Sequence, residues 1–259
     1  MTNPVAQPDG NFIVIIPARL ASTRLPNKPL ADIAGKPMVV RVAERARLSG
    51  ASRVLVAADH ADIVAACQLH GVEVILTRGN HPSGTDRIAE AATGLQLDAQ
   101  AVVVNVQCDE PLIDPELIAA TAALISAKVP MATAAHPLSE MAEVMNPNIV
   151  KVVLNRTGHA LYFSRAAIPW HRDGFATGCE QMPAGYQSLR HIGLYAFSNA
   201  FLQTYPTLEH SPLEQIEALE QLRVLWHAYP IAVHITPHPA APGVDTAQDL
   251  ARVRHLFGQ

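Results

Sequence analysis

Three cations at wide spacing, Arg19, Arg24 and Lys28, directly follow the apolar segment 12–16. Several cationic side chains in one loop can bind an anion, and a triphosphate is the natural candidate. The prolines of this stretch restrict the backbone and would hold the cations close to binding geometry before a ligand arrives. Surface Arg and Lys are common, so a solvated basic loop remains the alternative interpretation.

The cationic loop matches neither of the common phosphate-binding motifs. It has no Gly-Lys-Ser/Thr sequence, which excludes a Walker A motif, and it lacks the glycines of a dinucleotide-binding fingerprint. An anion would therefore be held by side-chain charge on a stiffened loop.

Two aspartates could add metal chemistry to this loop. Asp109 follows the apolar segment 101–106, and Asp245 follows the segment 231–236. At strand carboxyl ends both carboxylates would face the same cleft as the cations. They could share Mg²⁺, which prefers one or two carboxylates together with phosphate oxygens and water. Asp is also a common helix cap and turn residue, so a purely structural role remains open for both.

Such distant residues need a scaffold, and the apolar pattern predicts one. Helices are predicted after Asp114, which precedes a proline at the favoured first helical position, and at residues 38–49, 60–70 and 85–92. Strands are predicted at residues 12–16, ended by Pro17, and at 53–58, 72–76 and 101–106. Alternating strands and helices are typical of parallel βαβ units. In an open parallel sheet, ligands bind at the carboxyl ends of the strands.

The pattern changes between about residues 130 and 200. Period-two segments at 151–154, 160–164 and 190–197 predict mixed or antiparallel strands, and the polar stretch 171–189 predicts a protruding loop. Ser211 and Glu214 then form a capping box that predicts one helix running to about His227. A strand at 231–236 and a helix at 246–257 follow.

Composition narrows the class of protein. The 259 residues are 49% apolar and 16% charged with a formal net charge of −4, which is ordinary for a soluble globular protein and argues against a nucleic-acid binder. Three distant cysteines without a C-x-x-C pair argue against a disulfide framework and a zinc site. No signal peptide and no membrane-spanning run of about 20 apolar residues is evident, so the cytoplasm is the simplest compartment.

Longer segments resemble a known family. PARLASTRLPNKPL and IAGKPMVVRVAERA resemble the amino-terminal signature of the sugar-acid cytidylyltransferases. Seven further blocks fall in the expected order: HPSGTDR, NVQCDEP, NPNIVKVV, ALYFSRAAIPW, RHIGLYAF, LEQLRVLW and GVDTAQDL. The chain is identified as a member of this family, and it is most similar to the members that activate 3-deoxy-D-manno-octulosonate (Kdo).

The resemblance implies a fold and an activity. The fold would be α/β: a Rossmann-like open, mostly parallel sheet flanked by helices, forming a single nucleotidyltransferase domain over residues 1–259. A mixed β insertion at about 150–200 would contribute to a homodimer contact and to sugar binding. The activity would be Mg²⁺-assisted in-line attack of the anomeric hydroxyl of Kdo on the α-phosphate of CTP. The products would be CMP-Kdo, for lipopolysaccharide synthesis, and pyrophosphate.

The resemblance also assigns roles to individual residues. Arg19, Arg24 and Lys28 would steady the triphosphate, with Arg19 and Lys28 also catalytic. Asp109 and Asp245 would hold one Mg²⁺, while a second would lie on the β- and γ-phosphates. Cytosine would be bound at Arg78, Ser83, Gly84 and Thr85. The sugar would be bound by Gln107, Arg165, His191, Tyr195, Glu220 and Gln221.

The residues alone leave structural alternatives open for several of these positions. Arg165 could equally be a surface or interface arginine. His191 and Tyr195 lie four apart on a predicted strand, where most such pairs are half-buried structural residues. Glu220 and Gln221 would ordinarily form a solvated helix face.

One position departs from the family pattern. The block that is normally Gln-Gly-Asp-Glu-Pro here contains Cys108 beside Asp109. Glycine often allows a positive φ or a close backbone approach, so Cys108 could displace Asp109 if φ is positive and would be harmless if it is negative. A CTP-binding protein without turnover therefore remains an alternative, as does an enzyme for 8-amino-Kdo or a sialic acid.

Overall fold

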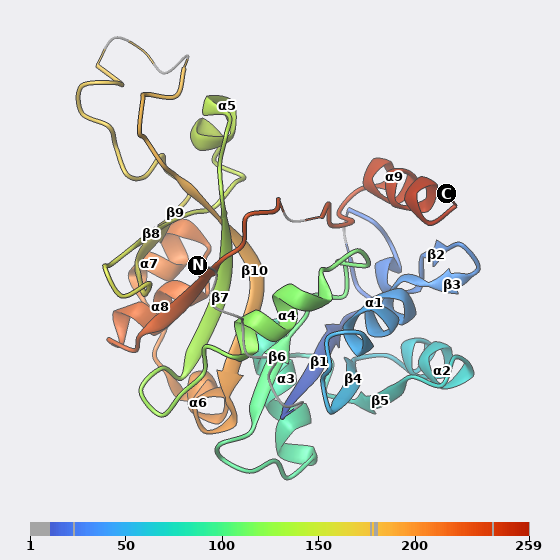
Figure 1. Ribbon diagram of the computed structural model, residues 1–259. Helices are drawn as coiled ribbons and strands as arrows, with labels where there is room; N and C mark the ends of the chain where they lie inside the picture. Colours follow the sequence, from blue (N-terminus) through green and yellow to red (C-terminus); the bar gives the residue numbers. More distant parts are fainter. Residues whose placement is uncertain (1–10, 23, 177, 179–180, 240, 259) are drawn as a thin grey trace. The chain divides into compact units, whose positions relative to one another are not determined.

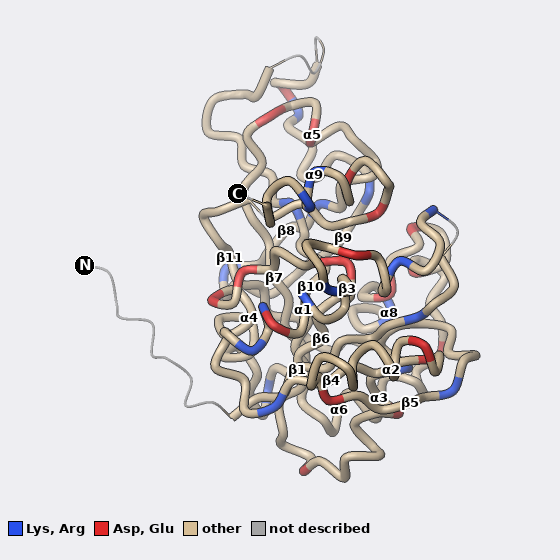
Figure 2. Tube along the Cα trace, turned by 90° about the vertical axis from the view of Figure 1, so that its right-hand side faces the viewer, with Lys and Arg blue, Asp and Glu red and all other residues tan. Residues whose placement is uncertain are grey.

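The computed structural model describes residues 11–22, 24–176, 178, 181–239 and 241–258. The chain divides into two compact units: residues 1–123, 194–206 and 240–259 form the first, and residues 124–193 and 207–239 form the second. Lys and Arg are interspersed with Asp and Glu over the trace (Figure 2). Among the described residues, no helix is both long and apolar enough to cross a bilayer.

The first unit is built on an open, mostly parallel sheet (Figure 1). The parallel strands β1 (Phe12–Ala18), β4 (Arg53–Ala58), β5 (Glu73–Leu76) and β6 (Val102–Asn105) lie in the order β6-β1-β4-β5. The end of β10 (Leu189–Ser198) pairs antiparallel with β6. The chain passes from β1 to β4 and β5 on one side of β1, and it then returns to form β6 on the other side. The strand order therefore reverses between β1 and β6, and open α/β sheets bind ligands at such a switch point.

Helices cover both faces of this sheet. The helices α1 (Met38–Arg47), α2 (Ala61–Leu69) and α4 (Pro115–Ala122) lie on one face, and α3 (Gly84–Gly94) and α6 (Asn199–Thr204) lie on the other (Figure 1). Side-chain caps fix their starts: Ser83 accepts a hydrogen bond from the Asp86 N–H at 3.1 Å, and Asp114 accepts one from Glu116 at 3.0 Å. The Rossmann-like fold predicted from the sequence is confirmed.

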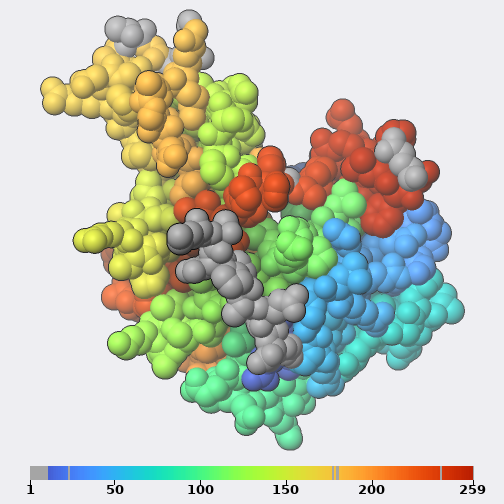
Figure 3. All heavy atoms as spheres, in the orientation of Figure 1, coloured from blue at the N-terminus to red at the C-terminus, as the bar shows by residue number. Residues whose placement is uncertain are grey.

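The last helix of the first unit closes a small core of its own. Helix α9 (Ala247–Phe257) lies against the hairpin of β2 (Asp32–Ile33) and β3 (Lys36–Pro37), as Figure 3 shows in red and blue. Ile33, Met38, Val244, Leu250 and Val253 are buried together there. The segment that carries Asp245 is thereby fixed from both sides.

The second unit contains the mixed strands. Strands β7 (Met131–Pro137) and β11 (Ile231–Ile235) are parallel, and β8 (Lys151–Leu154) pairs antiparallel with β9 (Ala160–Ser164) and with the start of β10. Its helices are α5 (Met141–Met145), α7 (Pro212–Glu217) and α8 (Gln221–Trp226). The short 3₁₀ turn η1 (Lys28–Leu30) belongs to the first unit, and η2 (Tyr205–Thr207) spans the division between the units. In the described part of 165–188 there is no helix or strand.

Two predictions about element boundaries were wrong. Strand β1 continues through Pro17 to Ala18, because Pro17 still lies opposite Ala57 in the parallel register. The single helix predicted after Ser211 is two helices, α7 and α8, interrupted at Ala218, whose φ is 50°. No Gly or Pro marks this break, and residue propensities there favour a continuous helix. Tertiary contacts of Glu214 and Glu217 accompany the interruption.

Candidate active site

Lys28 joins two carboxylates from distant segments of the first unit. Its Nζ donates to Asp109 Oδ2 at 2.6 Å and to Asp245 Oδ1 at 3.0 Å. Arg24 Nη2 lies 3.2 Å from the same Asp245 oxygen. Burial opposes the charge of Lys28, but the two carboxylates outweigh it and raise the pKa of Lys28. The structure therefore brings Arg24, Lys28, Asp109 and Asp245 together as a charged cluster.

Local backbone geometry places these side chains. Lys28 begins the turn η1 after Asn27, which adopts a left-handed conformation with φ of 55° that Asn tolerates well. Asp109 lies in the turn after β6, and its carbonyl accepts a hydrogen bond of 2.8 Å from the N–H of Val244. That bond holds the segment of Asp245 beside the end of β6.

Arg19 leaves β1 at the same edge of the sheet. Its side chain is exposed, as is that of Arg24, so both are accessible to a ligand. Arg19 is close enough to Cys108 for its charge to act on the pKa of that thiol. The cationic loop and the Asp109 turn thus share the switch point of the sheet.

The two aspartates form a donor set that suits a hard cation. Both carboxylates already converge on one positive group, the Lys28 ammonium, and Mg²⁺ prefers carboxylate oxygens completed by phosphate and water. No group of three or more His, Cys, Asp or Glu side chains within the described ranges is arranged to hold a metal. A magnesium ion at Asp109 and Asp245 would therefore need oxygens from a bound nucleotide.

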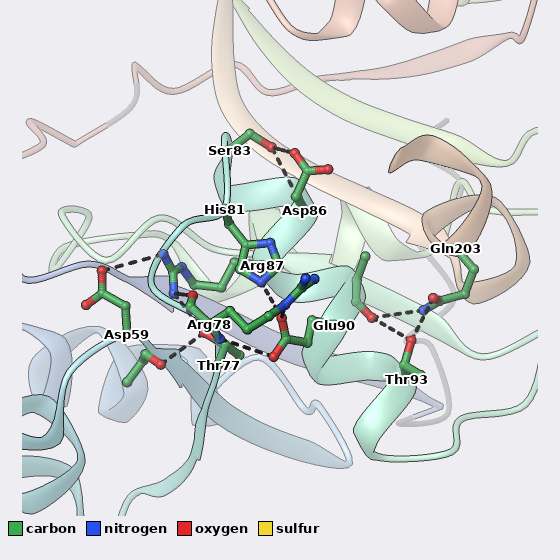
Figure 4. A network of polar contacts seen from close by, with 12 residues as sticks. Asp59, Thr77, Arg78, His81, Ser83, Asp86, Arg87, Glu90, Thr93 and Gln203 are labelled. Atoms are coloured by element: carbon green, nitrogen blue, oxygen red, sulfur yellow. Dashed lines mark hydrogen bonds and ion pairs between the residues drawn. The ribbon is translucent and has the colours of Figure 1, made fainter. Parts of the chain in front are cut away.

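The residues predicted to bind cytosine lie after β5 and in the first turn of α3 (Figure 4). Arg78 is largely exposed, and its Nε lies 2.9 Å from Glu90 Oε2. The Ser83 hydroxyl caps α3 and donates to Asp86, Gly84 is the first residue of the helix, and Thr85 is buried. Of these four residues, Arg78 is the most accessible to a ligand.

The residues predicted to bind the sugar are divided between the two units. Gln107 and Tyr195 belong to the first unit, where Gln107 precedes Cys108 and Tyr195 lies opposite Asn105 on β10. Arg165, His191, Glu220 and Gln221 belong to the second unit. Glu220 is exposed at the start of α8, whereas Gln221 is buried in its first turn. A solvated helix face, the structural alternative for this pair, therefore fits Glu220 and does not fit Gln221.

Arg165 is held by a network within the second unit. Its Nε donates to the carbonyl of Glu217 at 2.7 Å, and its backbone N–H donates to the Glu217 carboxylate at 2.9 Å. The fully buried Lys151 donates to the Arg165 carbonyl at 2.6 Å and to two further carbonyls. The orientation of Arg165 is therefore fixed by backbone contacts on both sides.

His191 is a neutral side chain in this environment. Its Nε2 lies 2.9 Å from the Thr133 hydroxyl, and its ring packs edge-on against Phe163 with centroids 4.9 Å apart. Burial lowers the pKa of His191 to about 3. A neutral imidazole can hydrogen-bond a sugar hydroxyl without adding charge.

The lowered pKa of His191 predicts a pH dependence of stability. An unfolded histidine titrates near 6.5, so the unfolded chain binds this proton more readily than the folded chain. The contribution to stability is complete above about pH 6.5 and falls toward pH 3, by roughly 1.4 kcal/mol per unit. Urea unfolding at pH 7, 6 and 5 gives the change of the unfolding free energy with pH, and this change should be smaller in His191→Gln than in the wild-type protein. Identical slopes in both proteins would contradict the assignment.

Cys108 does not have the backbone conformation that would require glycine. The described non-glycine residues with positive φ are Asn27, Ala34, Gln96, Ala218 and Ala228. Burial, and next the charge of Asp109, raise the pKa of the Cys108 thiol to about 12. A thiol with this pKa stays protonated near neutral pH and is a poor nucleophile.

Restoring the family's glycine should change little in the chemistry. We expect Cys108→Gly to keep kcat/KM within about threefold, because no left-handed backbone is relieved, and to lose about 0.5–1 kcal/mol of stability from added chain entropy. Pyrophosphate release and urea unfolding measure the two effects. A large gain in turnover would show that Cys108 distorts the Asp109 turn.

Sequence reasoning missed four buried or half-buried polar residues that contact predicted site residues or their sequence neighbours: Asp59, Arg87, Lys151 and Glu217. The available signals were weak. Asp59 directly follows a predicted strand, and Arg87 ends the HPSGTDR block, but Lys151 and Glu217 looked like ordinary polar positions. Their partners lie far away in the sequence, so only the fold reveals their contacts.

Comparisons with known proteins identify the family of this chain. The family described as Cytidylyltransferase matches residues 13–231. A 3-deoxy-manno-octulosonate cytidylyltransferase of Herminiimonas arsenicoxydans is 71% identical over 96% of this chain and 100% of its own length. The protein of that name from Neisseria gonorrhoeae (strain NCCP11945) is 59% identical over 95% of this chain and 98% of its own.

A solved structure extends the likeness to three dimensions. It is CMP:2-keto-3-deoxy-manno-octonic acid synthetase complexed with CTP, with a TM-score of 0.87, 39% identity, and coverage of 95% of this chain and 98% of that chain. The residues that the family matches, 13–231, include the cationic loop and the Asp109 turn. The family match, the high identities and the shared fold together show that this chain belongs to the cytidylyltransferase family.

Proposed function

We propose that this protein is a 3-deoxy-manno-octulosonate cytidylyltransferase, which joins CTP and Kdo to give CMP-Kdo and pyrophosphate. The observation that carries the proposal is the cluster of Lys28, Asp109 and Asp245 at the switch point of the sheet. The names of the relatives that are 71% and 59% identical support the same substrates.

The proposed reaction depends mainly on charge and position. The anomeric hydroxyl of the sugar attacks the α-phosphorus of CTP in line, the bond to the β-phosphate oxygen breaks, and pyrophosphate leaves. Arg19, Arg24 and Lys28 neutralise the triphosphate and the charge that develops on the leaving pyrophosphate. Because the two exposed arginines flank a stiff loop, they can contact the nucleotide at little entropic cost.

The proposed metal ligands are Asp109 and Asp245. Mg²⁺ bound there would polarise the α-phosphate and lower the pKa of the attacking hydroxyl, and a second ion is proposed on the β- and γ-phosphates. With Lys28 in contact with both aspartates, the ammonium keeps the carboxylates paired and oriented when no nucleotide is bound. No protein base is assigned.

The proposed sugar contacts follow the chemistry of each side chain. Arg165 would pair with the sugar carboxylate. His191 and Tyr195 would hydrogen-bond hydroxyls through neutral groups. Gln107, Glu220 and Gln221 are proposed to bind further hydroxyls, and the buried Gln221 Nε2, which has no hydrogen-bond partner among the described atoms, is a donor suited to such an oxygen.

The cellular context is proposed on the same basis. The product would supply lipopolysaccharide synthesis, and the enzyme would act in the cytoplasm as a homodimer. The region of about 150–200 is proposed to contribute to the dimer contact. Analytical ultracentrifugation would test the dimer independently of the activity.

Pyrophosphate release tests the proposed function directly. The protein is incubated with Mg²⁺ and CTP together with Kdo, 8-amino-Kdo or a sialic acid, and Kdo is also paired with UTP, ATP and GTP. Release with CTP and Kdo alone is expected. Release with another acid sugar would change the substrate and keep the mechanism, whereas CTP binding without release in every arm would favour the non-catalytic alternative.

A further inference from the structure

We propose that the buried pair of Asp59 and Arg87 is a positioning element that couples the cationic loop after β1 to the base loop after β5. The pair would set the separation between the groups that bind the triphosphate and the groups that bind the base. This inference rests on the proposed function, because it assumes that both loops bind one nucleotide.

Arg87 anchors the base loop. Its side chain is 4% exposed, and its Nη1 donates to the Thr77 hydroxyl at 2.7 Å and to the Arg78 carbonyl at 3.0 Å (Figure 4). Arg87 also lies on α3, one turn after the Ser83 cap, so the same guanidinium ties the helix start to the loop that precedes it. The backbone on either side of Arg78 is therefore fixed by one buried group.

Asp59 anchors the cationic loop. Its Oδ1 accepts a hydrogen bond of 2.9 Å from the N–H of Leu20, the residue after Arg19. Its own N–H donates to the Ala18 carbonyl at 3.2 Å, which closes a short ring between the ends of β4 and β1. The start of the cationic loop is therefore held by the side chain and the backbone of one residue.

The ion pair connects these two anchors. Arg87 Nη2 lies 3.5 Å from Asp59 Oδ2, and the two side chains are 4% and 12% exposed. A guanidinium at this depth requires a carboxylate, because an unpaired buried charge is costly. The chain of contacts therefore runs from the Leu20 N–H through Asp59 and Arg87 to Thr77 and the Arg78 carbonyl.

Arg87 and the exposed Arg19 differ in how their charges are balanced. Burial lowers the pKa of Arg87, Asp59 opposes that change, and the charge of Arg19 adds to the lowering. Arg19 and Arg87 are therefore close enough for their charges to repel each other, and the Asp59 carboxylate balances the charge of the buried Arg87. The exposed Arg19 is left to meet an incoming anion.

Breaking the pair should therefore weaken nucleotide binding specifically. We expect Arg87→Lys and Asp59→Asn each to raise the KM for CTP about tenfold, since small displacements of positioning groups have effects of this size or larger. The KM for Kdo should stay within about twofold. Arg87→Met should be more severe than Arg87→Lys, which keeps a cation opposite Asp59.

A structural readout separates coupling from general loosening. The Leu20 amide donates to Asp59 and is connected to Arg87 through that carboxylate, so hydrogen exchange at this amide should accelerate in Arg87→Lys if Asp59 transmits the change. Arg53→Gln is the matched control, because it breaks an exposed Arg53–Glu73 ion pair between β4 and β5 at the other end of these strands. It should leave the KM for CTP and the Leu20 exchange rate unchanged.

Unchanged or uniformly raised KM values would overturn the inference. Folded Arg87→Lys and Asp59→Asn proteins with the wild-type KM for CTP, or with equal increases in both KM values, would reduce the pair to a structural role. If wild-type protein releases no pyrophosphate, the proposed function fails first. Calorimetric CTP binding by wild type and variants then still tests the coupling: wild-type affinity in the variants refutes it, and a specific loss supports it.

Discussion

Asp109→Asn should reduce kcat/KM for pyrophosphate release by on the order of 10³-fold while the protein stays folded. The Asp109 carboxylate contacts the Lys28 ammonium at 2.6 Å and is one of two oxygen donors proposed for Mg²⁺. The neutral amide keeps the size of the side chain, but it removes the negative charge that pairs with the Lys28 ammonium and that is proposed to bind Mg²⁺. Steady-state pyrophosphate release at saturating Mg²⁺, together with a circular dichroism spectrum, measures the effect.

Asp114→Asn is the matched control for this substitution. Asp114, five residues after Asp109, is exposed and is the N-cap of α4. Asn is an equally good N-cap. Turnover should therefore stay at the wild-type level. An Asp109→Asn protein with turnover within about tenfold of wild type would remove Asp109 from the metal site, since the loss of a charged ligand has a larger effect.

Glu214→Gln should lower the free energy of unfolding by about 3–5 kcal/mol, because it leaves Arg223 as a buried, uncompensated charge. Arg223 donates to Glu214 through Nε at 2.9 Å and through Nη2 at 2.6 Å, and the two side chains are 4% and 9% exposed. Glu214 also completes the capping box with Ser211. Urea unfolding of wild type and variant gives the difference.

The Glu214 effect should depend on pH. Burial raises the pKa of Glu214, but its bonds to Arg223 outweigh burial and the net pKa is lowered. The stabilisation is therefore complete above the unfolded value of 4.5 and is lost as the pH falls through the lower folded pKa. The difference between the proteins should shrink below about pH 4.5.

The exposed Glu209→Gln is the control for this variant. It should unfold at the wild-type urea concentration, because the Glu209 side chain is solvated. A Glu214→Gln protein that loses less than about 1 kcal/mol would show that Arg223 finds water or another acceptor, contrary to the buried pair seen in the structure.

Local sequence signals predicted much of the fold. The strands at 53–58, 151–154 and 160–164 have the predicted limits, because short runs that contain valine or aromatic residues and are bounded by turn residues are strong signals. The caps at Asp114 and Ser211 were likewise predicted and are confirmed, since each depends on contacts within one turn.

The features that were missed depend on distant partners. The interruption at Ala218 has no glycine or proline to mark it, and the pairing of Asp59 with Arg87 spans two connections of the sheet. The approach of Asp109, Lys28 and Asp245 was expected because all three were predicted near the same sheet edge. That Lys28 contacts both carboxylates was not expected, because spacing along the chain cannot show which of three cations lies between them.

The charged cluster around Lys28 also has a consequence for how the protein is made. Lys28 and Asp245 are 217 residues apart, and a ribosome adds about 5–20 residues per second, so roughly 10–40 s separate the synthesis of the two partners. Asp109 follows Lys28 by 81 residues, so for the rest of that interval the nascent chain carries the ammonium and the first carboxylate without the second. The amino-terminal strands can assemble early, but the chemical centre matures only when the segment before α9 has emerged. A stalled or prematurely terminated product lacking that segment would therefore bury much of the sheet and lack one of the two carboxylates that contact Lys28.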